Sequence, residues 1–202
     1  MSDKLTVVLP LKGRVKYTHR FLSYLNEKKC PFKILIADGG SDVNLEETLN
    51  YENVNYEYIR YPADNSLPDF FSKMKDVTSR VETKYVTLQD NDDYFDIDGM
   101  NKSVDILEKE NYHSARGMVI HKGNRNMYAK YPNSIIDDTS AGRVIDQTRH
   151  FHSNWHNVMY SNILKTTWDL INLVKPTNFR FVEQINCYVP VAIGNGYRGD
   201  YP

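Results

Sequence analysis

The sequence has few of the features that mark secreted or disulfide-stapled proteins. Its 202 residues include only two cysteines, Cys30 and Cys187, and neither has the spacing of a metal-ligand or redox motif. Both are expected to be free thiols, as is usual in a reducing compartment. The first residues are polar and lead directly into an apolar segment, without the pattern of a secretory signal. These features predict a cytoplasmic protein.

Long apolar runs and an excess of basic charge are also lacking. No apolar run approaches the roughly 18 residues that a membrane span requires, and only a peripheral membrane association stays open. The 25 Lys and Arg residues are balanced by 26 Asp and Glu residues, which gives a net charge of −1. Nucleic-acid-binding domains usually carry a basic excess on one face, so no nucleic-acid partner is expected.

What remains is the composition of an ordinary globular domain. Hydrophobic residues make up 41% of the chain and charged residues 25%. This length is sufficient for one domain with its own core, so residues 1–202 are expected to form a single domain. The tail, residues 194–202, contains three glycines and no expected element. That tail is compatible with a natural protein that continues beyond Pro202.

The first half of the chain alternates short apolar runs with amphipathic segments. The runs predict strands at residues 5–11, 32–37, 54–59 and 85–88. The amphipathic segments predict helices at 18–28, 44–49, 67–81 and 98–110, with Thr18 as the N-cap of the first. Strands separated by helices imply an α/β fold with a mostly parallel central sheet flanked by helices.

The second half has a less regular pattern. Strands are expected at residues 115–121 and 157–160, and helices at 163–174 and 181–193, the last interrupted at Pro190. Residues 123–156 are polar and rich in loop-forming residues, and no element is assigned there. The change in pattern divides the chain into residues 1–110 and 111–202.

Polar clusters follow three of the expected strands. They are Lys12-Gly13-Arg14, Asp38-Gly39-Gly40 and Asp90-Asn91-Asp92-Asp93. Because ligands of open α/β sheets bind beyond the carboxyl ends of the strands, we expect the three clusters to converge on one edge.

The third cluster places three carboxylates within four residues. Carboxylates this close repel one another unless a cation or a proton lies between them, and oxygen ligands suit Mg²⁺ or Mn²⁺. Such a cation would neutralise a diphosphate leaving group. A solvated acidic turn ahead of the next helix is the alternative, but the position after an apolar strand favours the metal.

Three motifs in register resemble family 2 glycosyltransferases of the GT-A fold. They are Val7-Val8-Leu9-Pro10 with Arg14, the segment from Ile36 to Asp42, and the segment from Tyr85 to Tyr94. Their order and spacing match that family's strand–Pro, strand–Asp-Gly-Ser and Asp-x-Asp-Asp pattern. The resemblance implies a Rossmann-like nucleotide-diphospho-sugar transferase fold. Residues 1–110 would be its nucleotide-sugar-binding half and residues 111–202 its acceptor-side half.

The resemblance implies nucleotide-binding roles after the first two strands. Pro10, Lys12 and Arg14 would line the nucleotide pocket. Asp38, beside Gly39, would accept a hydrogen bond from the imide N–H of uracil or thymine, because a carboxylate is a strong acceptor. A UDP- or dTDP-sugar donor is therefore expected. Simple turn chemistry is the alternative for the Asp-Gly pair, and a surface position ahead of the helix is the alternative for Arg14.

The resemblance also implies roles around the acidic cluster. Asp90 and Asn91 would contact the ribose or the donor sugar. Asp92 would hold Mn²⁺ or Mg²⁺ together with Asp90, and Asp93 would support them. The family usually has an Arg-Asn pair in the preceding helix. This chain departs from that pattern, and Lys73 is the substitute phosphate contact.

A late glutamate is the candidate general base. An inverting transfer needs a carboxylate that deprotonates the acceptor hydroxyl, and similar enzymes supply it from a Glu-Asp motif at the start of a late helix. Glu183 is the only acidic residue between Asp169 and Asp200. Gln184 stands where the family often has Asp. A glutamate that merely favours the helix dipole is the alternative.

Aromatic and histidine residues cluster before the last expected strand. Trp155 and His156 are interpreted as acceptor-side residues, because the flat apolar face of an indole suits a pyranose ring. Metal ligation by the nearby histidines and ordinary packing are the alternatives.

Together these patterns predict a metal-dependent, inverting glycosyltransferase of the hexosyltransferase type. It would move a sugar from a nucleoside diphosphate to a hydroxyl of a saccharide or lipid-linked acceptor. Two other functions stay open. One is a catalytically silent nucleotide-sugar-binding module, which Gln184 favours. The other is a sugar nucleotidyltransferase, although its usual Gly-rich signature is longer than Lys12-Gly13-Arg14.

Overall fold

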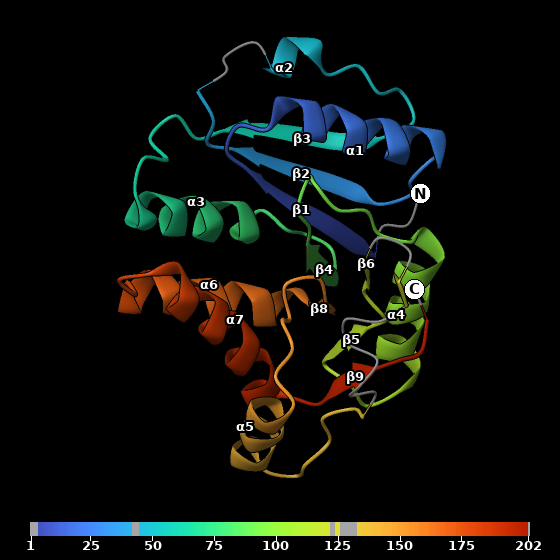
Figure 1. Ribbon diagram of the computed structural model, residues 1–202, viewed down its shortest axis with the longest axis vertical. Helices are drawn as coiled ribbons and strands as arrows, with labels where there is room; N and C mark the ends of the chain where they lie inside the picture. Colours follow the sequence, from blue (N-terminus) through green and yellow to red (C-terminus); the bar gives the residue numbers. More distant parts are fainter. Residues whose placement is uncertain (1–3, 42–44, 122–123, 126–132, 202) are drawn as a thin grey trace.

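The computed structural model describes residues 4–41, 45–121, 124–125 and 133–201 (Figure 1). A seven-stranded sheet has the order β3-β2-β1-β4-β8-β5-β9. Its strands are β1 (Leu5–Leu11), β2 (Lys33–Asp38), β3 (Asn55–Arg60), β4 (Tyr85–Leu88), β5 (Ser114–Arg116), β8 (Val158–Tyr160) and β9 (Gly196–Arg198). The helices are α1 (Val15–Glu27), α2 (Leu45–Thr48), α3 (Leu67–Ser79), α4 (Ile97–Lys109), α5 (Ser140–Arg149), α6 (Ser161–Val174) and α7 (Phe179–Ile193).

The sheet is mostly parallel, as the strand–helix alternation predicts. β1 pairs in parallel with both β2 and β4, and β2 pairs in parallel with β3. β8 enters between β4 and β5 and is antiparallel to both. Both halves of the chain therefore contribute strands to one sheet. A separate two-stranded ribbon pairs β6 (Ile120–His121) with β7 (Asn124–Arg125).

Helices cover both faces of the sheet. One core cluster packs α1, α2 and α4 against one face, and a second packs α3, α6 and α7 against the other (Figure 1). Neighbouring residues of β1 serve opposite clusters: Val7 and Leu9 belong to the first and Val8 to the second. Burial on both faces explains why β1 is a continuous apolar run instead of an alternating one.

The order of the strands shows at which edge of the sheet a ligand is expected to bind. From β1 the chain proceeds to β2 and β3 on one side, whereas β4 lies on the other side of β1. The switch point is therefore between β1 and β4, and open α/β sheets bind their ligands at the carboxyl ends of such strands. The register aligns Val8 of β1 with Leu88 of β4. The residues that follow both strands are thus brought together.

Several expected boundaries differ from the structure. α1 begins at Val15, three residues before the expected N-cap, and Thr18 is buried inside the helix. The strand expected at 115–121 is divided into β5 and β6. α7 is not interrupted at Pro190 but continues to Ile193, although the proline has no N–H to donate within the helix.

Three elements, β7, α5 and β9, were not expected from the sequence. α5 forms in the segment left unassigned, and the Thr139 hydroxyl caps it by accepting a hydrogen bond from the Gly142 N–H at 2.9 Å. β9 forms in the glycine-containing tail by pairing in parallel with β5. Among the described residues, no helix combines the length and the apolar character needed to cross a bilayer.

Candidate functional site

The turn between β1 and α1 determines where Arg14 points. Gly13 and Arg14 both have positive φ angles, 71° and 58°, which end the strand sharply and start the helix. Arg14 is the N-cap residue but makes no side-chain cap hydrogen bond. Its guanidinium instead donates from Nη1 to Oδ2 of Asp92 at 2.6 Å, in a largely exposed ion pair.

Asn91 and Asp92 attach the loop after β4 to α1. The buried Asn91 amide donates to the Thr18 hydroxyl at 3.0 Å and more weakly to the Arg14 carbonyl at 3.4 Å. Arg20 donates to the Asp92 carbonyl at 2.7 Å. We expected Asn91 to contact the donor sugar. In the structure the Asn91 side chain instead points into the protein, where its hydrogen bonds link this loop to α1.

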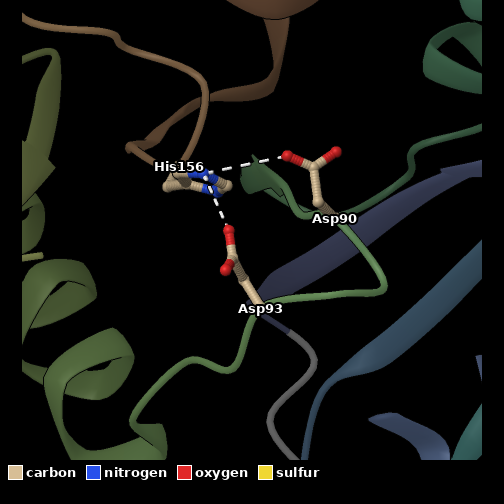
Figure 2. Close-up of side chains that lie close together, drawn as sticks. All are labelled: Asp90, Asp93 and His156. Atoms are coloured by element: carbon tan, nitrogen blue, oxygen red, sulfur yellow. Dashed lines mark ion pairs between the residues drawn. The ribbon is translucent and has the colours of Figure 1, made fainter. Parts of the chain in front are cut away.

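Three other side chains form the candidate metal centre. Figure 2 shows the carboxylates of Asp90 and Asp93 both pointing toward the His156 imidazole. His156 Nε2 lies 3.9 Å from Oδ2 of Asp90 and 4.0 Å from Oδ2 of Asp93. One ligand atom of each of the three residues lies within 4.8 Å of the other two.

This geometry differs from the ligand set inferred from the sequence, which stays a prediction. There, Asp92 and Asp90 were the metal residues and Asp93 their support, with His156 on the acceptor side. In the structure Asp93 and His156 lie beside Asp90, whereas the carboxylate of Asp92 is paired with Arg14. The reason is the turn after β4, in which consecutive side chains point in different directions.

The electrostatics of the cluster fit a divalent cation. Burial raises the pKa of Asp90, the His156 imidazole opposes this shift, and the Asp92 and Asp93 carboxylates raise the pKa further. Burial lowers the pKa of His156, while Asp90 and Asp93 oppose that shift. A neutral imidazole next to two clustered carboxylates is a donor set that can hold Mn²⁺. Mg²⁺ would rely on the carboxylates alone.

Asp38, at the end of β2, is fully engaged inside the protein. Its side chain is buried, and Oδ1 accepts a hydrogen bond from the Gly40 N–H at 2.7 Å. Oδ2 accepts from the Tyr58 hydroxyl at 2.5 Å and from Arg60 Nη1 at 3.3 Å. These contacts support the turn-chemistry alternative. Base recognition by Asp38 stays a prediction. Asp42, the last residue of the second motif, lies outside the described residues.

Lys12, Lys73 and Asp64 form a network beside β1. Lys73 Nζ donates to Oδ2 of Asp64 at 2.5 Å and to the Leu11 carbonyl at 3.0 Å, and Lys12 Nζ donates to the Asp64 carbonyl. Burial lowers the pKa of Lys73, which its pairing with Asp64 opposes. A Cβ atom on Gly39 would collide with the Asp64 carboxylate, which explains the glycine. The buried ammonium of Lys73, expected to contact a phosphate, is thus held by protein groups.

Three adjoining cavities run along this edge of the sheet. The lysine cavity, about 380 Å³, is lined by Pro10, Lys12, Asp64, Lys73 and Phe179, among others. The central cavity, about 340 Å³, is lined by Asp90, Asp93, His156 and Glu183, among others. The aromatic cavity, about 410 Å³, is lined by Tyr24, Tyr94, Phe95 and Tyr201, among others. Asp90 and Trp155 line both the lysine and the central cavities, and Asp93 and His156 line both the central and the aromatic cavities.

The structure brings Glu183 and Trp155 to the acidic cluster. Glu183 is exposed in the first part of α7 and faces the same central cavity as Asp90 and His156. Trp155 packs edge-on against the buried Trp168 with ring centroids 6.3 Å apart. It lines both the lysine and the central cavities, and its acceptor-side role stays a prediction.

Two residues of this edge were missed in the sequence. Asp64 follows β3 without any motif around it, yet it holds both lysines. Arg116, at the end of β5, is mostly buried and lines both the central and the aromatic cavities. Its Nη1 donates to the Ser153 carbonyl at 2.6 Å. In the sequence it lay near the start of the strand expected at residues 115–121, so nothing marked it as a site residue.

Comparison with known proteins identifies the fold. The sequence matches no protein-family model and none of the curated proteins. Its fold matches the crystal structure of S. aureus TarS 1–349, with a TM-score of 0.67 and 15% identity over 96% of this chain and 57% of that one. The S. aureus TarS structure gives 0.68 and 14% over 98% of this chain and 37% of that one. The TarS 1–349 complex with UDP-GlcNAc gives 0.65 and 12%, covering 98% and 59%.

These similarities establish an α/β, GT-A-like fold with a mostly parallel seven-stranded sheet flanked by helices. The chain spans less than two thirds of the TarS chains that it matches.

Proposed function

We propose that this chain is the nucleotide-sugar-binding catalytic domain of a metal-dependent glycosyltransferase similar to family 2. The observation that carries the proposal is the Asp90, Asp93 and His156 cluster at the switch point of the sheet, with Glu183 in the same cavity. The matched TarS 1–349 protein has been crystallised with UDP and with UDP-GlcNAc, which supports a UDP-sugar donor. A cytoplasmic location remains part of this proposal.

The nucleotide is proposed to occupy the lysine cavity. Its lining includes Pro10 and Lys12, and it adjoins the cluster through Asp90. A diphosphate that extends from this cavity toward Asp90 and Asp93 would reach the metal centre. The exposed guanidinium of Arg14 lies beside Asp92 on the same edge and can exchange this carboxylate partner for a phosphate.

Asp90, Asp93 and His156 would hold Mn²⁺ or Mg²⁺ in this proposal. When bound, the cation neutralises the charge that develops on the leaving diphosphate. Removing one of these side chains should weaken nucleotide binding only when the metal is present. That dependence separates metal ligation from a direct contact with the nucleotide.

Glu183 is the proposed general base of an inverting transfer. Its carboxylate would accept the proton of an acceptor hydroxyl as the oxygen attacks the anomeric carbon, from the face opposite the diphosphate. The acceptor is proposed to be a saccharide or a lipid-linked saccharide, and the transferred group a hexosyl unit. The neighbouring aromatic cavity has the space for such an acceptor, and Arg116 at its border can bind a polar group.

A donor screen by thermal unfolding tests the proposal. UDP, dTDP and GDP would each be added with and without Mn²⁺. At about 100 times the dissociation constant, the matching nucleotide should raise the Tm by about 5 to 10 °C with Mn²⁺ and much less without it. No metal-dependent shift with any nucleotide would contradict the proposal.

Turnover then separates the enzyme from the two other functions. A matching UDP-sugar should be transferred to an acceptor, or slowly hydrolysed without one. Nucleotide binding without turnover would indicate the silent module. Formation of a nucleotide-sugar from a nucleoside triphosphate and a sugar phosphate would indicate the nucleotidyltransferase.

A further inference from the structure

Large apolar side chains are exposed around the turn between α6 and α7. Twelve such side chains are exposed among the described residues, and five of them lie within this short stretch of chain. We name these five the turn patch: Leu170, Leu173, Val174, Phe179 and Phe181. Leu173 is the most exposed of the twelve, at 78%. Figure 1 shows α6 beside α3, with α7 following it.

The patch is a second apolar face of α6. The helix already buries Ile163, Leu164, Trp168 and Ile171 against the sheet. The spacing of Leu170, Leu173 and Val174 is i, i+3, i+4, so these three lie together on another side. A surface helix normally has polar residues opposite its buried stripe. Large apolar side chains that gather on an exposed part of a fold can mark an interaction site.

Two cations lie within the patch, and the acidic residues Asp169 and Glu183 lie at its two ends. Lys175 ends α6 with a φ of 50°, Arg180 lies in the first turn of α7, and both are exposed. The sequence has no acidic residue between Asp169 and Glu183. Asp169 itself is paired with Lys75 at 2.9 Å. The patch therefore combines protruding apolar side chains with two cations.

The patch adjoins the candidate site. Phe179 packs against Phe70 with ring centroids 5.9 Å apart, and it lines both the lysine and the central cavities. Glu183 follows one turn later on the same helix. Whatever binds the turn patch thus lies at the border of the cavities.

We propose that the turn patch binds the surface of a lipid bilayer that contains anionic lipids. Apolar side chains that enter the headgroup boundary next to basic residues are the physical basis of interfacial membrane binding. Anionic headgroups complement Lys175 and Arg180. The alternative occupant is a second copy of the chain, which would present the same surface across a two-fold contact.

Bound in this way, the protein would hold its central cavity close to the membrane surface. That position suits a lipid-linked acceptor whose saccharide extends out of the bilayer. This consequence rests on the proposed function, whereas membrane binding itself does not, since it is measured without donor or acceptor.

Vesicle co-sedimentation tests the proposal. The chain would be mixed with phosphatidylcholine vesicles, with and without about one third phosphatidylglycerol. Leu173→Asp places a charge at the most exposed apolar position and should reduce the bound fraction about tenfold or more. The matched control is Ile145→Asp on α5, where the isoleucine is 49% exposed outside the patch. This control should bind like the unmodified chain.

Charge reversal and a folding check complete the experiment. Lys175→Glu with Arg180→Glu should remove the preference for anionic vesicles. Each variant should retain its circular dichroism and any Tm shift with UDP and Mn²⁺, so a failed nucleotide site is distinguishable from a failed membrane surface.

Three outcomes would overturn the proposal. The unmodified chain could remain in the supernatant with every vesicle. Leu173→Asp and Ile145→Asp could reduce binding equally, which would show that no particular surface is used. Light scattering could show a dimer that Leu173→Asp disrupts while vesicles stay unbound, and a second copy would then be the occupant.

Discussion

Two neighbouring parts of the same sheet edge differ in how their charges are balanced. Beside β1, Lys73 and Asp64 form an ion pair of 2.5 Å with side chains only 1% and 3% exposed. At the end of β4, Asp90 and Asp93 remain 42% and 65% exposed and come no closer than 3.9 Å to His156. The first set is paired within the protein, whereas the second keeps like charges close together.

This difference indicates that the first set stabilises the fold, whereas the second set is suited to bind a ligand. A buried ion pair holds a structure in place only while both partners are present, because either partner alone is a buried charge. A group of clustered carboxylates has an electrostatic repulsion that a bound cation relieves. Substitutions in the first set should therefore change the free energy of unfolding, and those in the second should change ligand binding.

The largest effect is expected at Asp64. Asp64→Ala leaves the Lys73 ammonium buried beside the Leu11 carbonyl, so the free energy of unfolding should fall by about 3–5 kcal/mol. Urea denaturation followed by circular dichroism measures this change. Adding Lys73→Met to the same chain should recover much of the loss. A decrease of less than about 1 kcal/mol would show that this ion pair contributes little to the stability of the fold.

The next effect concerns Glu183. Glu183→Gln should reduce sugar transfer by at least about 100-fold, because the amide cannot accept the acceptor proton. Affinity for UDP with Mn²⁺ should stay unchanged in calorimetric titration. Gln184→Ala, at the neighbouring exposed position, is the matched control and should retain its rate. Near-normal turnover of Glu183→Gln would assign the base elsewhere.

A smaller effect distinguishes Asp93 from Asp92. Asp93→Ala removes a proposed metal ligand and should weaken Mn²⁺-dependent UDP binding by more than about tenfold, since even outer-shell partners of metal ligands contribute that much. Asp92→Ala removes only the Arg14 partner and should change this affinity by about threefold or less. The reverse order, measured by calorimetry, would restore the ligand set inferred from the sequence.

The smallest effect belongs to the Arg14–Asp92 ion pair itself. Its side chains are 59% and 41% exposed, so a double-mutant cycle with Arg14→Ala and Asp92→Ala should give a coupling of about 0.2–1 kcal/mol in stability. The coupling should become weaker in 1 M salt, where the screening length falls to about 3 Å. A larger or salt-independent coupling would show that this ion pair stabilises the fold in the way proposed for Lys73 and Asp64.

The sequence predicts the first half of the fold closely. β1 and β4 have the expected bounds because each is a short apolar run bordered by polar residues. Polar clusters after β1 and β4 were expected to meet, and the Arg14–Asp92 pair joins them. These features are local in the chain or follow from a general rule of parallel sheets, so pattern alone is sufficient.

The missed features depend on contacts between distant segments. Adjacent aspartates in a turn look equivalent in a sequence, and only the structure shows that Asp90 and Asp93 lie beside His156 while Asp92 is paired with Arg14. β9 is only three residues long and exists through its pairing with β5. α5 had a local signal in its N-cap, Thr139, which the polar surroundings obscured.

The position of β8 has a consequence for how the chain reaches this fold. Its pairing with β4 joins Tyr160 to Tyr85, residues far apart in the sequence, and such non-local pairings form slowly. During synthesis, β4 leaves the ribosome well before its antiparallel neighbour and keeps one row of backbone groups unpaired. Unpaired strand edges promote aggregation. A nascent chain stopped shortly after α4 should therefore depend on chaperones until the later strand arrives.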